Sequence, residues 1–180
     1  MRTTIGFLIA GAFIFLCTSC SEHHNEWSKY QDRAFSIRMP VKPVVTDKVE
    51  ITPFGKQNVR HVTWKPATLE LNKFKLFQVS YTDCPARYVA DSMKTNGTLD
   101  SSINLRKKDF TETEILSEPI EINGYPGRAF IYDPARDNVI TIVKQVIAAN
   151  KIFDLTVIAK RDYPTNTEIN TFFNSFTVFR

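Results

Sequence analysis

Very short connections between apolar segments limit the folds open to the second half of the chain. The pair Asn123-Gly124 stands between two such segments, and a second short connection lies near Asn150-Lys151. An Asn-Gly pair tolerates the positive φ angles that a tight hairpin needs. A connection this short joins only antiparallel neighbours, because a parallel crossover needs a dozen or more residues. The sequence therefore predicts antiparallel strands at residues 113–122, 125–133, 139–149 and 152–159.

The first half of the chain shows similar strand patterns. Residues 35–39 alternate apolar and polar before a proline, which lacks an amide proton and suits the end of a strand. Residues 49–51 and 59–64 flank the turn sequence Pro-Phe-Gly at 53–55 and predict a hairpin. Residues 74–81 predict one more strand.

The middle of the chain predicts two helices. Residues 83–85 combine a capping aspartate with a proline suited to a first turn, and they open a helix that runs through Met93. A break is expected at Asn96-Gly97. In the second helix, apolar residues recur at helical spacing, namely Leu99, Ile103 and Phe110.

The clearest helical pattern lies near the end of the chain. Thr165 and Glu168 have the spacing of a capping box, in which each side chain bonds the backbone of the other residue. An apolar stripe follows at helical spacing: Ile169, Phe172, Phe173 and Phe176. We expect this stripe to be buried against the sheet.

The first residues have the layout of a secretory signal. Arg2 precedes an apolar run at residues 5–17, and small residues then lead to Cys20. The run is shorter than the roughly 20 residues that a membrane-spanning helix needs. The sequence therefore predicts a leader that is removed rather than a permanent membrane span.

The end of this leader resembles the lipobox of bacterial lipoproteins. Residues 17–20 read Cys-Thr-Ser-Cys, with cysteine at the position where the family usually has leucine. The resemblance implies that residues 1–19 are removed as a signal peptide and that Cys20 carries the lipid. The polar residues that follow would form a tether, so residues 20–26 are expected to be the lipidated cysteine and its linker.

The remaining residues, 27–180, are expected to form a single domain of α+β class, with an antiparallel β-sheet flanked by helices. About 150 residues is a usual size for one domain. After processing, Cys84 is the only thiol that is not acylated, so an internal disulfide is excluded. The net charge of the whole chain is only +4, which does not indicate a nucleic-acid partner.

Several short motifs give the domain a family resemblance. The chain resembles the PsbP/DcrB-like family, which includes photosystem subunits, a Ran-binding nuclear-transport protein and envelope lipoproteins. The resemblance implies an α/β/α sandwich and binding of a partner whose identity the family does not fix. The motifs that carry it are residues 35–40, Gly55, residues 81–85, residues 122–128 and residues 172–176.

Two residues are candidates for catalysis. His61 would be needed for a nucleophilic triad, but a half-exposed strand histidine is the simpler interpretation. Cys84 precedes a predicted helix, and a thiol in that position can become reactive. The alternative is a cysteine that packs in the interior. The sequence contains no Gly-x-Ser-x-Gly, Walker or dinucleotide motif, so no catalytic residue and no cofactor are predicted.

Other polar groups have simpler structural interpretations. Glu22 and two neighbouring histidines lie in the tether, where ordering would cost too much entropy for a defined metal site. Glutamates at 112, 114, 118 and 121 are expected on a solvated strand face, and the basic residues 106–108 on an exposed helix face. Residues 124–127 are expected to form a turn with close packing.

We therefore expect a non-enzymatic lipoprotein of the cell envelope, anchored through Cys20 and sorted to the outer membrane. Its domain is expected to bind or support another protein. One alternative is a carrier of small molecules or lipids that lines a pocket with some of the 14 phenylalanines. Another is an enzyme that uses Cys84 or His61.

Overall fold

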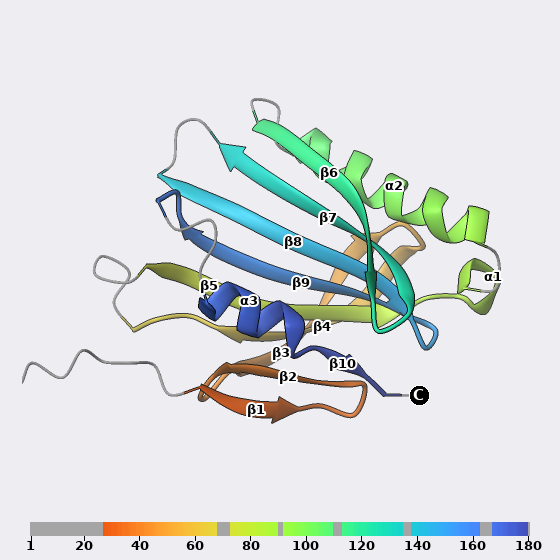
Figure 1. Ribbon diagram of the computed structural model, residues 1–180. Helices are drawn as coiled ribbons and strands as arrows, with labels where there is room; N and C mark the ends of the chain where they lie inside the picture. The colour runs from red at the N-terminus through yellow and green to blue at the C-terminus, as the bar shows by residue number, and fades with distance from the viewer. Residues whose placement is uncertain are drawn as a thin grey trace, which may run out of the picture.

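Antiparallel strands form a seven-stranded sheet in the order β3-β4-β5-β9-β8-β7-β6 (Figure 1). The structure is a computed structural model, and it describes residues 27–67, 73–89, 92–109, 113–134, 138–162 and 167–179. The strands of this large sheet are β3 (Val44–Thr52), β4 (Gly55–Trp64), β5 (Phe74–Asp83), β6 (Thr113–Ile122), β7 (Tyr125–Pro134), β8 (Val139–Ala148) and β9 (Lys151–Lys160).

The two tight hairpins of the second half are confirmed. Strands β6 and β7 pair through a turn in which Asn123 and Gly124 have φ angles of 53° and 79°. Between β8 and β9 the central turn residues are Ala149 and Asn150, with φ angles of 48° and 57°. This turn lies one position earlier than predicted, because Lys151 belongs to β9 and has ladder partners on both sides.

The predicted hairpin around residues 53–55 is also confirmed, with Gly55 at a φ angle of 95°. Both of its strands are longer than residues 49–51 and 59–64. The extension of β3 toward Val44 was not predicted because β3 is exposed along almost its whole length. A strand with no buried face has no need of an apolar alternation that sequence reasoning could detect.

A second, three-stranded sheet has the order β1-β2-β10. The predicted strand at residues 35–39 is confirmed as β2 (Phe35–Pro40), which lies between β1 (Trp27–Gln31) and β10 (Thr177–Val178). The two outer strands were not predicted. β1 has no buried residue and β10 has only two residues, so neither carries a clear periodic pattern.

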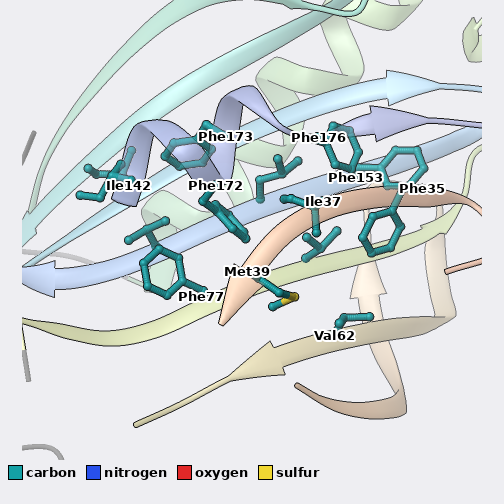
Figure 2. Close-up of a cluster of buried hydrophobic side chains, with 14 of the residues drawn as sticks. Phe35, Ile37, Met39, Val62, Phe77, Ile142, Phe153, Phe172, Phe173 and Phe176 are labelled. Atoms are coloured by element: carbon teal, nitrogen blue, oxygen red, sulfur yellow. The ribbon is translucent and has the colours of Figure 1, made fainter. Parts of the chain in front are cut away.

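One face of the large sheet is covered by β2 and by α3 (Thr167–Asn174). Figure 2 shows the phenylalanines of α3 pointing toward the sheet, beside the apolar side chains of β2. Phe172 is fully buried, and its ring centroid lies 5.2 Å from that of Phe77 on β5. The predicted apolar stripe is thus confirmed; its Thr165 cap lies outside the described residues. The fully buried aromatic residues of this core are Phe35, Phe77, Phe153, Phe172 and Phe176.

The opposite face carries α1 (Ala86–Val89) and α2 (Ser92–Asp109). The expected break at Asn96-Gly97 is wrong, because both residues lie inside α2 and the described helices separate earlier, after Val89. An exposed glycine costs a helix only about 1 kcal/mol, which tertiary packing can offset. Among the α2 residues whose burial is described, the buried ones recur at helical spacing but are mostly polar: Thr95, Thr98, Leu99 and Ser102.

The α/β/α sandwich describes this architecture only in part. The antiparallel sheet and the helices are present, so the α+β class is confirmed. However, α3 shares its face with the small sheet, and α2 packs on β7 and β8 without covering β3 to β5 (Figure 1). The molecule is therefore dominated by its two sheets.

Asp32 connects the small sheet to the large one. Its carboxylate accepts hydrogen bonds from the Tyr81 hydroxyl at 2.9 Å and from Arg60 Nε at 3.2 Å, both on the large sheet. The Arg33 backbone N–H donates to the same carboxylate. Burial alone would raise the pKa of Asp32, but these hydrogen bonds outweigh it and hold the pKa below its ordinary value.

No helix within the described ranges is long and apolar enough to cross a membrane. Residues 1–26, which include the predicted leader, Cys20 and the tether, lie outside the described residues.

Candidate ligand-binding site

A row of polar side chains crosses the large sheet on the face that carries α2. Successive members of the row are direct register partners on neighbouring strands. Chain neighbours of two of them, Tyr81 after Ser80 and Phe153 before Asp154, point into the core on the other face, as strand alternation requires. The row consists of Thr46, His61, Ser80, Asp154, Gln145 and Arg128, from β3, β4, β5, β9, β8 and β7.

A cavity of about 250 Å³ lies over the centre of this polar row. Ser80, Asp154 and Gln145 contribute to it from the sheet, and Ser102 contributes from α2. The tip of the β3–β4 hairpin supplies another wall, residues 50–53. This tip is fastened to α1, because the Phe54 ring lies 5.1 Å from that of Tyr88. The cavity is therefore bordered by separate parts of the fold.

Two buried polar atoms in the cavity lining have no hydrogen-bond partner. One is Oε1 of Gln145, a residue that is only 2% exposed, and the other is Oγ of Ser102, which is 6% exposed. The amide orientation of Gln145 is fixed because Nε2 donates to Asp154 Oδ1 at 2.6 Å. Leaving a buried polar atom unpaired costs about 1–3 kcal/mol, so both atoms call for an explanation.

A second cavity, of about 510 Å³, lies at the β3–β4 end of the same face. His61 lines it and is held in a chain of contacts. Gln78 accepts a hydrogen bond from Thr63 at 3.2 Å, and its Nε2 lies 3.1 Å from His61 Nδ1. His61 Nε2 lies 3.0 Å from Glu50 Oε1 but is not aligned for a good hydrogen bond.

The two cavities have opposite charge character. Among the described residues, the smaller one is lined by Glu50 and Asp154 and by no lysine, arginine or histidine. The larger one is lined by three lysines, 42, 48 and 65, as well as His61 and Glu50. Glu50 lines both, so it marks the boundary between an acidic cavity and a mainly basic groove.

Cys84 is buried and free, and it follows β5 directly. Burial raises the pKa of its thiol to about 11, the opposite of what a reactive cysteine requires. The helix that it precedes, α1, has only four residues. The packing interpretation of Cys84 therefore agrees with its surroundings, among Leu99, Ile147 and Ile152.

The structure does not bring His61 and Cys84 together. His61 is the register partner of Ser80, whereas Cys84 lies four residues further along the chain, roughly 13 Å in an extended strand. Within the described ranges, no group of three or more His, Cys, Asp or Glu residues could hold a metal ion. His61 therefore lies in the polar row and not beside the thiol.

The remaining predicted polar groups are described only in part. Glu118 and Glu121 are exposed on β6, as expected for a solvated face. Gly127 shows the expected close packing, because a Cβ atom there would lie 2.4 Å from the Gln145 carbonyl oxygen. Residues 106–108 belong to α2, Glu114 belongs to β6, and the described residues do not include Glu112 or Glu22.

Sequence reasoning missed the centre of the cavity. The apolar alternation of residues 153–157 indicates that Asp154 lies on the face opposite Phe153 and Leu155, but nothing in the sequence connects it with Gln145, Ser80 or Ser102. These residues meet only through strand register and through a helix that packs with a polar face. The one available signal was a glutamine inside an apolar strand, because a buried amide needs partners.

The fold resembles a solved structure, although the sequence is distant from it. The solution structure of cyanobacterial PsbP (CyanoP) from Synechocystis sp. PCC 6803 gives a TM-score of 0.57 at 13% identity. The alignment covers 91% of this chain and 99% of that chain. No protein-family model and no curated protein matches the sequence. The expected resemblance is thus confirmed for the fold: the chain has a PsbP-like fold.

Proposed function

We propose that this chain is a non-enzymatic lipoprotein of the bacterial cell envelope, and that its domain binds a partner protein along the edge of β3. A lipid on Cys20 would tether it to the outer membrane. The tether is supported by the apolar leader, by the small residues before Cys20 and by the polar residues after it. The observation that carries the binding function is the exposure of β3.

β3 is an edge strand of the large sheet and is exposed along almost its whole length. Four of the five large hydrophobic side chains exposed in the described ranges belong to it. Val49 and Ile51 are the most exposed of them, at 68% and 76%, and both lie on the same side of the strand. An edge strand offers free backbone groups to an added strand, while side chains of this kind give the contact apolar area.

The opposite edge of the sheet is better protected. β6 carries Pro119, together with the exposed glutamates Glu118 and Glu121. Proline and charge are the usual means by which edge strands avoid pairing with other chains. Leu116 is the only one of the five exposed large hydrophobic residues found there. The difference between the two edges supports β3 as the site of partner binding.

The two alternative functions, a carrier of small molecules or lipids and an enzyme that uses Cys84 or His61, have less support. No phenylalanine among the described residues lines either cavity, and the buried phenylalanines of the described chain instead pack together, most of them in the core between α3 and the sheet. That arrangement speaks against a carrier with an aromatic pocket. The burial of Cys84 and its distance from His61 speak against a catalytic pair.

Site-specific crosslinking tests the proposed interface. A photoreactive amino acid is placed at Val49 in the full-length chain in its native cells, and at Leu116 as the matched control on β6. We expect Val49 to give one reproducible protein adduct and Leu116 to give none. Equal yields from the two positions would overturn the proposal.

A variant with added charge on β3 provides a second test of the proposed interface. The pair Val49→Lys and Ile51→Lys is expected to abolish the adduct formed from a photoreactive group at Val45, because lysine on an edge strand opposes strand addition. The control, Leu116→Lys, should leave the adduct unchanged. All three substituted residues are exposed on the surface, so each substitution is expected to alter the free energy of unfolding by about 0.5 kcal/mol or less.

A further inference from the structure

We propose that the partner bound along β3 is a second copy of this chain, and that Val49 lies on the two-fold axis of the pair. The inference rests on the proposed function, since it names the occupant of the same edge. It depends on the order of charges along β3 and on the symmetry of two identical strands.

Symmetry restricts how two copies of β3 can pair. When identical edge strands pair antiparallel, one residue faces its own copy, and residues equidistant from it lie opposite each other. Opposite side chains point to the same face, so this pairing joins the two large sheets into one continuous sheet. β3 has nine residues, and the registers that pair most of it are centred on Asp47, Lys48 or Val49.

Two of these registers place like charges together. Centring on Lys48 sets two ammonium groups opposite each other, and centring on Asp47 does the same with two carboxylates. Like charges directly opposite each other destabilise a strand pair. The register centred on Val49 avoids this repulsion.

The Val49 register also brings favourable pairs together. On one face it joins two valine side chains, each 68% exposed in the single chain, and Ile51 lies diagonal to the partner's Val49. On the other face Lys48 lies opposite the partner's Glu50, and by symmetry Glu50 lies opposite the partner's Lys48. The contact is therefore apolar on one face and has two opposite-charge pairs on the other.

Contacts within the single chain are compatible with this pairing. Glu50 Oε1 lies 3.0 Å from His61 Nε2, but a carboxylate has a second oxygen that can accept from the partner's lysine. The Glu50 side chain is half exposed, and Lys48 is exposed as well. Asp47 keeps its ion pair with Arg60. The second copy therefore requires no contact of the single chain to break.

The pair is expected to be weak in dilute solution, because one added strand buries less area than a stable interface needs. Copies tethered to the same membrane would meet at a much higher local concentration. The test is therefore made on the full-length chain in its native cells, with a method that traps weak pairs.

Disulfide trapping tests the register. Residues directly opposite each other have Cα atoms about 4.5–5.5 Å apart, which suits a disulfide, so Val49→Cys should give a covalent dimer on oxidation. The matched controls are Val45→Cys and Ile51→Cys, on the same face of the same strand. In this register their copies lie at least about 13 Å apart, so neither should form a dimer. Equal trapping at the three positions would overturn the register.

Charge reversal tests the two ion pairs in the Val49→Cys background. Lys48→Glu or Glu50→Lys alone sets like charges opposite each other in both pairs, and should slow trapping by about five-fold or more. Cells that make both variants, with different tags, should form the mixed dimer at the original rate, because each pair again has opposite charges. The control is Lys29→Glu, the same change on an exposed lysine outside the large sheet, which should have no effect. No recovery in the mixed dimer would overturn the assigned pairs.

The identity of the photocrosslinked adduct at Val49 separates this inference from the proposed function. An adduct that contains two copies of this chain supports both. An adduct with a different protein would overturn the second copy but leave β3 as the binding edge. The absence of any adduct would contradict both proposals.

Discussion

Asp32 shows how one buried carboxylate can hold two sheets together. Its side chain is only 4% exposed, and its partners Tyr81 and Arg60 both belong to the large sheet. Arg60 also pairs with Asp47, whose side chain is 59% exposed. The same guanidinium therefore has a buried partner and an exposed partner, which allows their contributions to be compared directly.

Replacing Asp32 by alanine should reduce the free energy of unfolding by about 2–4 kcal/mol, because it leaves a buried hydroxyl and a partly buried guanidinium without their acceptor. Asp47→Ala is the matched control, since it removes the exposed partner of the same arginine, and should cost less than about 1 kcal/mol. Urea denaturation measures both. Similar losses in the two variants would contradict this account of Asp32.

The Asp32 contribution should also depend on pH. The pKa of Asp32 is lower in the folded chain than its ordinary value of 3.8, so the unfolded chain binds the proton more readily. The stabilisation is then fully present above about pH 4 and is lost as the pH falls below that value. We expect the stability difference between the natural chain and Asp32→Ala to shrink on acidification. A difference that stays constant down to pH 2 would refute this.

Cys84 should be unreactive in the folded protein. Burial raises the pKa of its thiol to about 11, so little thiolate exists between pH 7 and 9. In a chain with Cys17 and Cys20 replaced by serine, a thiol reagent should label Cys84 only at the rate at which the chain opens. Rapid stoichiometric labelling of the native chain near pH 7, at the rate of a free thiol, would contradict the prediction.

At the scale of elements, helix α3 was predictable because one strong stripe of large apolar residues marks its buried face. Phe172 lies at the centre of that stripe, fully buried between the rings of Phe77 and Phe173. In contrast, the buried residues described in α2 are mostly small and polar, so no strong apolar stripe outweighed the turn signal Asn96-Gly97, and the break predicted there was wrong. A helix or strand can be predicted from the sequence when its buried face differs chemically from its exposed face.

Phe172→Ala should destabilise the fold by about 3–5 kcal/mol, because the lost ring leaves a cavity between α3 and the sheet. Asn170→Ala, on the exposed side of the same helix, is the control and should change stability by about 0.5 kcal/mol or less. Chemical denaturation compares the two. If Phe172→Ala were as stable as the control, α3 would not be part of the core.

The strands that could be predicted from the sequence also have a buried face that differs from their exposed face. Those of the second half have short turns and clear alternation, and their existence and antiparallel pairing were predicted. β1, β10 and most of β3 were not, since they bury few side chains. The polar row and its cavity also could not be predicted, because they depend on the register of six strands relative to one another.

For the whole molecule, the proposed lipid anchor is the feature with the largest effect on where the chain works. Cys20→Ser removes the only proposed acylation site. We expect the chain to move from the membrane fraction to the aqueous fraction after cell disruption, while the melting temperature of the domain is unchanged. Cys84→Ser is the control and should stay with the membranes. Intact mass spectrometry should show acyl mass on the natural chain and none on Cys20→Ser.

The small sheet joins the two ends of the described chain, since β1 and β10 flank β2 (Figure 1). A domain held by its amino end would receive every mechanical load through β1. That pull would reach the large sheet through the Trp27 ring, which packs on Phe77 of β5, and by way of β2, the packing of Phe35 and the contacts of Asp32. The force needed to unfold the domain would then depend on the three short strands of the small sheet more than on the pairing of the seven strands of the large sheet.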